Sequence, residues 1–278
     1  MMLRVILLTA LAMLAFAGNS LLCRVALRDS ELDPASFTAI RLVSGALVLC
    51  LLVMLRGKGR VQGDWRSALA LFGYAAGFSF AYVELDAGTG ALVLFGAVQA
   101  SMIGYGWLHG ERLRALQIVG LLCAIGGLLL LLLPGASAPQ PQAAGMMLLA
   151  GVAWAFYSLL GRGNSDPLAA TAGNFLRSLP ALLPLCLLYY PHLQWDRLGA
   201  FYALLSGALA SGIGYAIWYT ALPHLRAMQA ASVQLSVPII AAVAGALLLG
   251  EQLSLRLLIA SVAVLGGIAL ILLVKAKA

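Results

Sequence analysis

Long apolar runs, separated by charged residues, proline or glycine, occupy almost the whole chain. Each run is about 20 residues long, the length that an α-helix needs to cross the hydrocarbon core of a bilayer. The runs are continuously apolar and lack the two-residue alternation of membrane β-barrel strands. The pattern therefore predicts ten membrane-spanning helices, at Leu3–Cys23, Ala35–Leu55, Ser67–Leu85, Ala91–Leu108, Ala115–Leu133, Gly145–Leu160, Ala169–Tyr189, Leu198–Ala221, Ala227–Leu249 and Leu255–Val274.

The composition supports an all-α integral membrane protein. Of the 278 residues, 63% are hydrophobic and only 10% are charged, which is far from the composition of a soluble domain. We therefore expect any function to lie inside the helix bundle or at its mouths. The N-terminus imitates a secretory signal, with Arg4, an apolar run and Ala15-Phe16-Ala17. Because the same segment recurs in the middle of the chain, we favour a retained helix.

The net charge of +7 is spread over short loops, without the clustered basic and aromatic face that nucleic-acid binding requires. Positive loops usually mark the cytoplasmic side of a membrane protein. If the N-terminus is cytoplasmic, the inner side holds Arg4, Arg56, Lys58, Arg60, Arg66, Arg112, Arg114, Arg162, Arg226, Lys275 and Lys277, and the outer side holds Arg24, Arg28, Arg197 and Arg256. This asymmetry predicts a multi-pass protein with both termini in the cytoplasm.

Two halves of the chain resemble each other. The loop Pro134–Ala143 lies near the midpoint, so we expect a first repeat over residues 1–138 and a second over residues 139–278. The matching segments are AFAGNSLLCR (Ala15–Arg24) with AWAFYSLLGR (Ala153–Arg162), GERL (Gly110–Leu113) with GEQL (Gly250–Leu253), and Gly126-Gly127 with Gly266-Gly267. Five helices in each half would make the second repeat enter the membrane in the opposite sense. Inverted repeats are typical of carriers that alternate access around a central site.

These features resemble the ten-helix EamA-type members of the drug/metabolite transporter superfamily. The resemblance covers nearly the whole chain and rests on the S-L-L-x-R endings, on the arginine in AIRLVSGALVL, and on the GERL and GEQL turns followed by glycine pairs. It implies a solute carrier of the bacterial inner membrane, often an exporter of amino acids, metabolites or toxic organic compounds, with a cavity between the halves.

Charged residues close to or inside predicted helices are the first candidates for function. An arginine well inside a helix costs roughly 2.5–3.5 kcal/mol unless it reaches the membrane surface or finds a partner. Arg41 is a candidate substrate-carboxylate clamp or gate, whereas Arg177 is a weaker candidate. Glu84 lies near the same end of the membrane as Arg41, and we expect the two to face each other across the cavity, with Glu84 as a gate or proton site. The alternative is that Glu84 and Asp86 are hydrated loop residues in the headgroup region. Asp86 fits a hydrated bend.

Polar and aromatic residues inside helices tend to face the interior of a bundle. The substrate-binding or gating candidates are Glu84, Arg41, Asn19, Tyr82, Gln99, Trp154, Tyr157, Trp218, Tyr219 and Gln234. Tyr105, Asn174 and Tyr215 belong to the same polar and aromatic set. As a group they would suit an amphipathic or aromatic solute, although core packing is the better explanation for any one of them. For Glu111 and Glu251 we favour a structural role, capping the helix that follows each turn.

Several chemistries have no visible motif. Cys23, Cys50, Cys123 and Cys186 stand singly, and the sequence has no Walker loop, G-x-S-x-G elbow or H-E-x-x-H motif. We therefore expect no cofactor, no metal and no enzymatic activity. The prediction is a secondary transporter that exports small organic metabolites, as a monomer or homodimer, with protons as a candidate coupling ion. The alternatives are a flippase for a lipid-linked substrate, and a non-transporting membrane enzyme or complex subunit.

Overall fold

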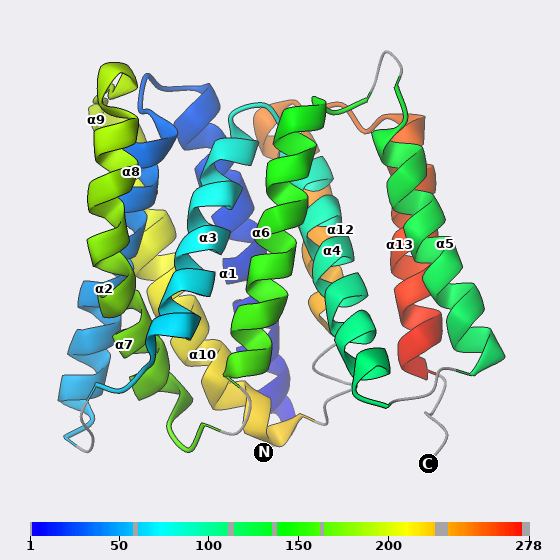
Figure 1. Ribbon diagram of the computed structural model, residues 1–278, viewed down its shortest axis with the longest axis horizontal. Coiled ribbons are helices and arrows are strands. Elements are labelled where there is room, and N and C mark those ends of the chain that lie inside the picture. Colours follow the sequence, from blue (N-terminus) through cyan, green and yellow to red (C-terminus); the bar gives the residue numbers. More distant parts are fainter. Residues whose placement is uncertain are drawn as a thin grey trace.

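The computed structural model describes residues 2–57, 61–110, 114–134, 138–161, 164–225 and 233–273, and the regular elements within these ranges are helices (Figure 1). The α-helices are α1 (Met2–Arg28), α2 (Pro34–Leu55), α3 (Trp65–Tyr82), α4 (Ala87–Leu108), α5 (Ala115–Leu132), α6 (Pro141–Leu160), α7 (Pro167–Ser178), α8 (Leu182–Leu188), α9 (Arg197–Leu205), α10 (Gly214–Ala221), α12 (Ser236–Leu249) and α13 (Leu255–Leu273). Short 3₁₀ turns η1 (Leu179–Ala181), η2 (Tyr190–His192) and η4 (Leu222–His224), and a π-helical segment η3 (Ser206–Ile213), complete the set.

These elements form the ten predicted spans, because two of the spans are composite. Helices α7 and α8 join through η1 into one apolar span, Pro167–Leu188, and α9 and α10 join through η3 into another, Arg197–Ala221. The all-α, ten-helix fold class is thus confirmed. Two helices predicted as continuous are interrupted. Pro180, which has no N–H to donate, lies in η1. In η3, the small residues of SGALASGI let the backbone widen into a π-helix.

Aspartates start four of the helices. Asp33, Asp64, Asp166 and Asp196 occupy the N-cap positions of α2, α3, α7 and α9, and each accepts a backbone N–H from the first turn. A side-chain acceptor here satisfies a donor that has no partner within the helix. Much of the scarce negative charge of the chain therefore serves helix ends.

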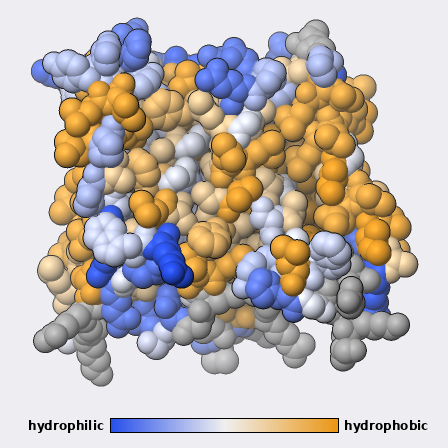
Figure 2. All heavy atoms as spheres, viewed as in Figure 1, coloured by the Kyte–Doolittle hydropathy of each residue, from blue (hydrophilic) through white to orange (hydrophobic). Residues whose placement is uncertain are grey.

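The two repeats are inverted with respect to each other. Helix α1 begins, and α13 ends, at the lower face in Figure 1, which we call the terminal face. Helix α6, the counterpart of α1, begins at the other face, which we call the distal face. In Figure 2 hydrophobic side chains form a broad band between hydrophilic residues along the upper and lower edges of the view, as expected for a protein that spans a bilayer.

Helices of one repeat pack mainly against helices of the other. Helix α3 contacts α6 just as α1 contacts α9 and α10, and α4 contacts α6 just as α1 contacts α12. Corresponding helices of the two repeats also contact each other directly, as α2 does with α7, α4 with α12, and α5 with α13. Small residues allow close approach, as in other membrane bundles; an added Cβ on Gly77 of α3 would lie 3.1 Å from the carbonyl oxygen of Met146 in α6.

Candidate functional site

A small cavity lies at the centre of the bundle, between helices of both repeats. Its walls include Phe16 and Asn19 of α1, Tyr74 and Phe78 of α3, and Trp154 of α6. Its volume is about 30 Å³, whereas small-molecule sites usually measure roughly 300–1,000 Å³. The structure therefore shows this space in a contracted state, too small for an organic solute.

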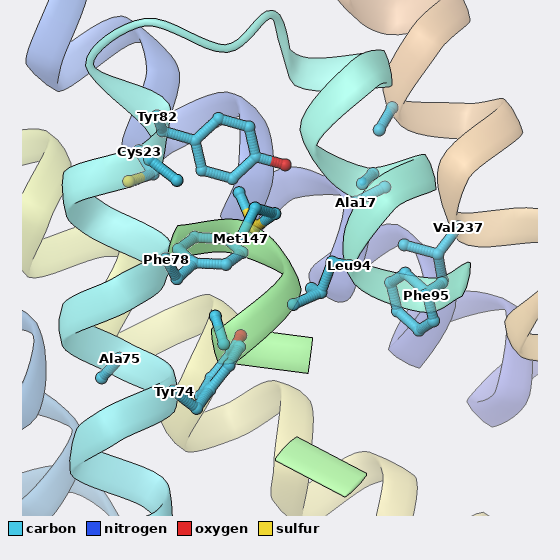
Figure 3. Packing of buried hydrophobic residues seen from close by; sticks show 14 of the residues in the cluster. Ala17, Cys23, Tyr74, Ala75, Phe78, Tyr82, Leu94, Phe95, Met147 and Val237 are labelled. Carbon is cyan, nitrogen blue, oxygen red and sulfur yellow. The ribbon is translucent and has the colours of Figure 1, made fainter. Parts of the chain in front are cut away.

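Aromatic rings from the two halves meet around the cavity. The Trp154 ring centroid lies 4.6 Å from that of Tyr74 and 5.5 Å from that of Tyr215, which also contacts Phe16 at 5.7 Å. Figure 3 shows Tyr74, Phe78 and Tyr82 following one another along α3, with Leu94 of α4 nearby. Such walls are apolar, with a polar atom at the edge of several rings.

Arg41 is buried directly behind two of these rings. Its side chain does not reach the membrane surface, since the residue is only 1% exposed. The guanidinium carbon lies 5.2 Å from the ring centroid of Tyr74 and 4.8 Å from that of Phe78. Its Nη2 donates to the Tyr74 hydroxyl at 3.1 Å and its Nε donates weakly to the Ser211 hydroxyl at 3.4 Å. Among the described residues, Nη1 has no hydrogen-bond partner.

Some of the predicted site residues are brought together at the cavity. Asn19, Trp154 and Gln234 line it, and the Asn19 Oδ1 accepts a hydrogen bond from Ser206 in η3 at 2.6 Å. The bond joins α1 of the first repeat to the π-helical segment of the second.

The other aromatic and amide candidates lie beyond the cavity lining. Tyr157 is buried with its ring 5.4 Å from that of Trp154, and Trp218 is buried with its ring 6.0 Å from that of Phe16. Tyr82 packs on Phe78, Gln99 is buried in α4, and Tyr219 is half-buried in α10. Whether these residues or the lining residues bind a solute stays a prediction.

The expectation that Glu84 faces Arg41 is wrong. Helix α3 ends at Tyr82, so Glu84 lies in the exposed turn that follows, where its carboxylate accepts a hydrogen bond from Gln140 at 2.9 Å. Arg41 instead contacts Tyr74, Phe78 and Ser211, as described above. The two residues were predicted to lie at a similar depth in the membrane, but a similar depth does not place two side chains next to each other in the bundle.

Three further residues have structural partners. Arg177 donates to the backbone oxygens of Gln62 and Gly173 at 3.0 and 3.3 Å, and Asn174 accepts the N–H of Asp64 at 3.0 Å. Both side chains anchor the connection between α2 and α3. Tyr105 is 41% exposed and stacks on His109.

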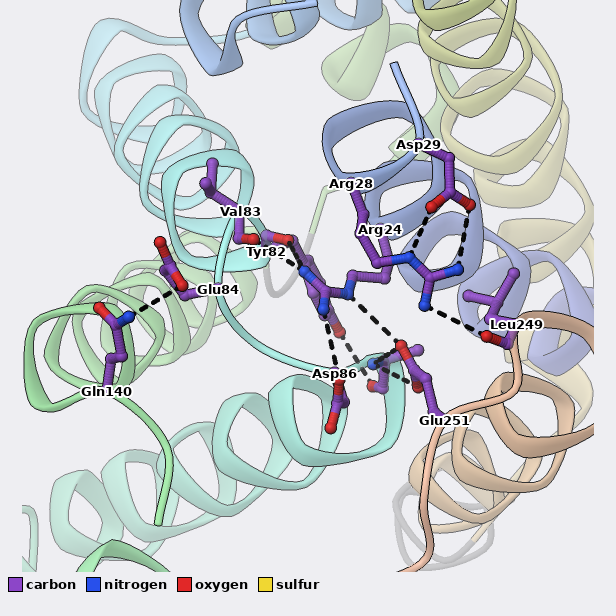
Figure 4. A network of polar contacts seen from close by, with 11 residues as sticks. Arg24, Arg28, Asp29, Tyr82, Val83, Glu84, Asp86, Gln140, Leu249 and Glu251 are labelled. Carbon is purple, nitrogen blue, oxygen red and sulfur yellow. Dashed lines mark hydrogen bonds and ion pairs between the residues drawn. The ribbon is translucent and has the colours of Figure 1, made fainter. Parts of the chain in front are cut away.

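At the distal face, Arg24 links the ends of several helices (Figure 4). Its Nη1 donates to the carbonyl oxygens of Tyr82 and Val83 at the end of α3, at 3.1 and 2.8 Å. Its Nη2 pairs with Asp86 at 3.3 Å, and its Nε lies 3.4 Å from the carboxylate of Glu251. We call Arg24, Asp86 and Glu251 the distal network. Because Arg24 belongs to the first repeat and Glu251 to the second, the network ties the halves together.

Glu251 caps a helix other than the one predicted. Its two carboxylate oxygens accept the N–H of Ala87, the first residue of α4, at 3.1 and 2.9 Å. Asp86 occupies the N-cap position of α4 but makes no capping bond with its side chain, and is therefore available to Arg24. Burial raises the pKa of the Glu251 carboxyl above its ordinary value of 4.5, although the Ala87 N–H and the Arg24 charge act in the opposite direction. Glu111, its counterpart in the first repeat, lies outside the described residues.

Sequence reasoning missed several of these residues. The four-residue spacing of Tyr74, Phe78 and Tyr82 in α3 is a signal for one helix face, and it was available in the sequence. The repeated S-L-L-x-R ending pointed to Arg24, but assigned it only to a loop. Nothing in the local sequence connects Arg24 with Glu251, because they come from opposite ends of the chain.

Comparisons with known proteins agree with this architecture. A family model described as the EamA-like transporter family matches residues 3–133 and again residues 142–273. An uncharacterised protein of Pseudomonas aeruginosa is 62% identical, covering 97% of this chain and 94% of its own length. An uncharacterised transporter of Bacillus subtilis, YoaV, is 24% identical over 86% of this chain and 87% of its own length. A crystal structure of a protein with 19% sequence identity superposes with a TM-score of 0.67, covering 95% of this chain and 94% of that one, and supports the fold alone.

Proposed function

The chain belongs to the EamA-like transporter family, and on this premise we propose that it is a secondary carrier that exports small organic metabolites across the bacterial inner membrane. The observation that carries the proposal is the central aromatic cavity, built from both inverted repeats and tied together on its distal side by Arg24 and Glu251. Inverted repeats can exchange conformations, and the exchange opens first one face and then the other.

Alternating access needs contacts that form when one face closes and break when it opens. The distal network has this character, because it consists of a few polar contacts between helix ends and not of a broad apolar interface. With the terminal face in the cytoplasm, as the loop charges favour, the network closes the periplasmic side.

The walls of the cavity favour amino acids or related amphipathic and aromatic compounds. Trp154, Tyr215 and Phe16 offer rings for stacking, and Asn19 and Gln234 offer amide groups at the same space. A proton gradient, or the gradient of the solute itself, would supply the driving force.

Reconstitution into liposomes tests this function. Liposomes that contain the purified protein are loaded with an unlabelled solute. The uptake of the labelled form of that solute is measured for a panel of amino acids and aromatic metabolites, with and without a pH gradient. Exchange that is selective for some solutes, lost in Trp154→Ala and kept in Arg256→Met, is the expected result. Arg256 suits the control because, within the described part of the chain, its side chain donates to the carbonyls of Leu133 and Pro134 at the distal rim. Absence of flux for every solute in the panel refutes the proposal.

A lipid-linked substrate is the second candidate. An apolar groove of about 420 Å³ runs between α1, α2 and α10, with Leu8, Leu52 and Ile217 among its walls. Such a groove suits an acyl or isoprenoid chain. Transfer of a fluorescent lipid-linked probe between leaflets in the same liposomes, without exchange of any soluble solute, favours this candidate.

A further inference from the structure

The proposed function leaves the chemical class of the solute open, and the environment of Arg41 narrows it. Resting on that function, we infer that Arg41 is the anion-binding residue of the carrier and that it binds the carboxylate of a solute whose body is aromatic or apolar. The geometric basis is a buried guanidinium behind two rings that line the central cavity, with one nitrogen that has no hydrogen-bond partner among the described residues.

The first step of the argument concerns charge. A guanidinium keeps its proton in any protein environment, and a charge placed in low dielectric is unfavourable unless a counter-charge compensates it. Arg41 lies about 10 Å along α2 from the start of that helix, and among the described residues its side-chain contacts are hydroxyls and rings, not carboxylates.

The other buried arginine of the first repeat shows the contrast. Arg24 pairs with two carboxylates and two backbone oxygens in the distal network. An arginine with a purely structural role is expected to be paired in this way. Among the described residues, Nε of Arg24 and Nη1 of Arg41 both lack a hydrogen-bond partner, but Nε of Arg24 lies 3.4 Å from the Glu251 carboxylate, whereas Arg41, which is 1% exposed, forms no ion pair there. An anion supplied by the solute would complete both its charge and its hydrogen bonding.

The second step concerns the shape of the anion and of the remainder of the solute. None of the described residues that line the cavity carries a charge, so the guanidinium of Arg41, behind the Tyr74 and Phe78 rings, is the single charged group in this argument. One guanidinium matches a carboxylate, which is a planar monoanion. The rings of Trp154, Tyr215 and Phe16 match an aromatic or apolar body, and their faces also accommodate the ammonium group of an amino acid.

The third step concerns access. Tyr74 holds Nη2 through its hydroxyl, and the Tyr74 and Phe78 rings separate the guanidinium from the cavity. Entry of a solute must therefore expand the space of about 30 Å³ and displace at least one of these rings. The carboxylate then replaces the Tyr74 hydroxyl as the acceptor for Arg41.

Matched pairs of ligands test the inference by binding alone. Each pair consists of an acid and its neutral amide, for example 3-phenylpropanoate with 3-phenylpropanamide, an indole acid with its amide, an aromatic amino acid with its amide, and an aliphatic acid with its amide. Affinities are measured by thermal shift and by titration of tryptophan fluorescence. We expect at least one acid to bind wild-type protein about tenfold or more tightly than its amide.

Variants then assign the preference to Arg41. Arg41→Met is expected to weaken the acid at least about tenfold and to change the amide by less than about threefold, and Arg41→Lys to restore part of the loss. Arg256→Met, which removes an arginine far from the cavity, is expected to behave as wild type. Equal loss for acid and amide in Arg41→Met, or no preference for the acid in any wild-type pair, overturns the inference. The wild-type comparison decides even if Arg41→Met does not fold.

Transport data separate this inference from the function on which it rests. Acid-selective binding that depends on Arg41, without flux in liposomes, supports the anion site and refutes the carrier. Gated flux that does not distinguish acids from amides supports the carrier and refutes the anion site.

Discussion

Replacement of Arg24 by glutamine is the sharpest test of the distal network. The variant loses two hydrogen bonds to the carbonyl oxygens of Tyr82 and Val83 and the two ion pairs to Asp86 and Glu251. If the network forms only when the distal face is closed, the variant destabilises the closed state alone. The face should then open more often.

The magnitude follows from the burial of the partners. The Asp86 side chain is 46% exposed, so its pair with Arg24 contributes at most about 1 kcal/mol. The Glu251 side chain is only 5% exposed, and leaving such a carboxylate without its cation costs about 3–5 kcal/mol. Since Glu251 keeps its bonds to the Ala87 N–H, we take the lower end, about 3 kcal/mol, which corresponds to roughly a hundredfold shift in the equilibrium.

Cys23 provides a native reporter for this opening. The residue is fully buried in α1, next to Arg24 in sequence. With Cys50, Cys123 and Cys186 replaced by alanine, the labelling rate of Cys23 by a membrane-impermeant maleimide from the distal side measures exposure of the interior. We expect Arg24→Gln to raise the rate by up to about a hundredfold.

Arg28→Gln is the matched control. Arg28 lies one turn further along α1. Its side chain, 32% exposed, pairs with the adjacent Asp29, which is 43% exposed, and donates one exposed hydrogen bond to the carbonyl oxygen of Leu249 at 3.2 Å. Such a pair contributes less than about 1 kcal/mol, so labelling should rise only slightly. Unchanged labelling in Arg24→Gln, in protein that labels fully after unfolding, contradicts the assignment of the network as a gate.

Three further predictions follow from single residues. Burial in the closed network raises the pKa of Glu251 above 4.5, so Glu251 takes up a proton more readily in the closed than in the open state, and a falling pH favours the closed state. Cys23 labelling, normalised to unfolded protein at the same pH, should therefore slow as the pH falls towards 4.5. Glu251→Gln should lose this pH dependence. Gly173→Ala places a Cβ against the carbonyl oxygen of Gln62 and should destabilise the fold by about 1–3 kcal/mol, whereas Gly145→Ala, with open space around it, serves as the control; equal melting temperatures of the two variants would contradict the packing. Because Glu84 is exposed, Glu84→Gln should leave transport and its pH dependence within about twofold of wild type, and loss of pH-driven accumulation would restore it as a proton site.

The sequence predicted well how deep a residue lies in the membrane, but it predicted poorly which face of each helix points into the bundle. Apolar length alone located the spans, and proline or aspartate at their ends marked where helices such as α2 and α7 begin. A soluble helix also reveals its inner face, because its other face is polar. In a membrane both faces are apolar, so polarity does not show which side of α3 faces the cavity, and only the four-residue spacing of its aromatic residues marks one face. For this reason Tyr74 and Phe78 were missed.

Glu84 and Glu251 show the same limit for charged groups. Both are carboxylates in turns at the distal end of helices, and their local sequences favoured function for the first and a local cap for the second. The structure leaves Glu84 at the surface with Gln140 and places Glu251 between Arg24 and the start of α4. Only the packing of one repeat against the other brings these partners together.

By itself the sequence determined the membrane-spanning fold, its ten helices and its internal doubling. The length of a hydrophobic run and the recurrence of a motif are local properties that can be read directly from the order of the residues. The tertiary structure decided which residues meet at the centre, since that depends on the rotation of each helix about its axis and on the interleaving of the two repeats. Glu84 and Arg41, which we expected to face each other across the cavity, contact different partners, and the structure shows two separate arginine environments. Arg24 is held by carboxylates at the distal face, and Arg41 is buried behind the aromatic walls of the cavity with a nitrogen left unpartnered among the described residues.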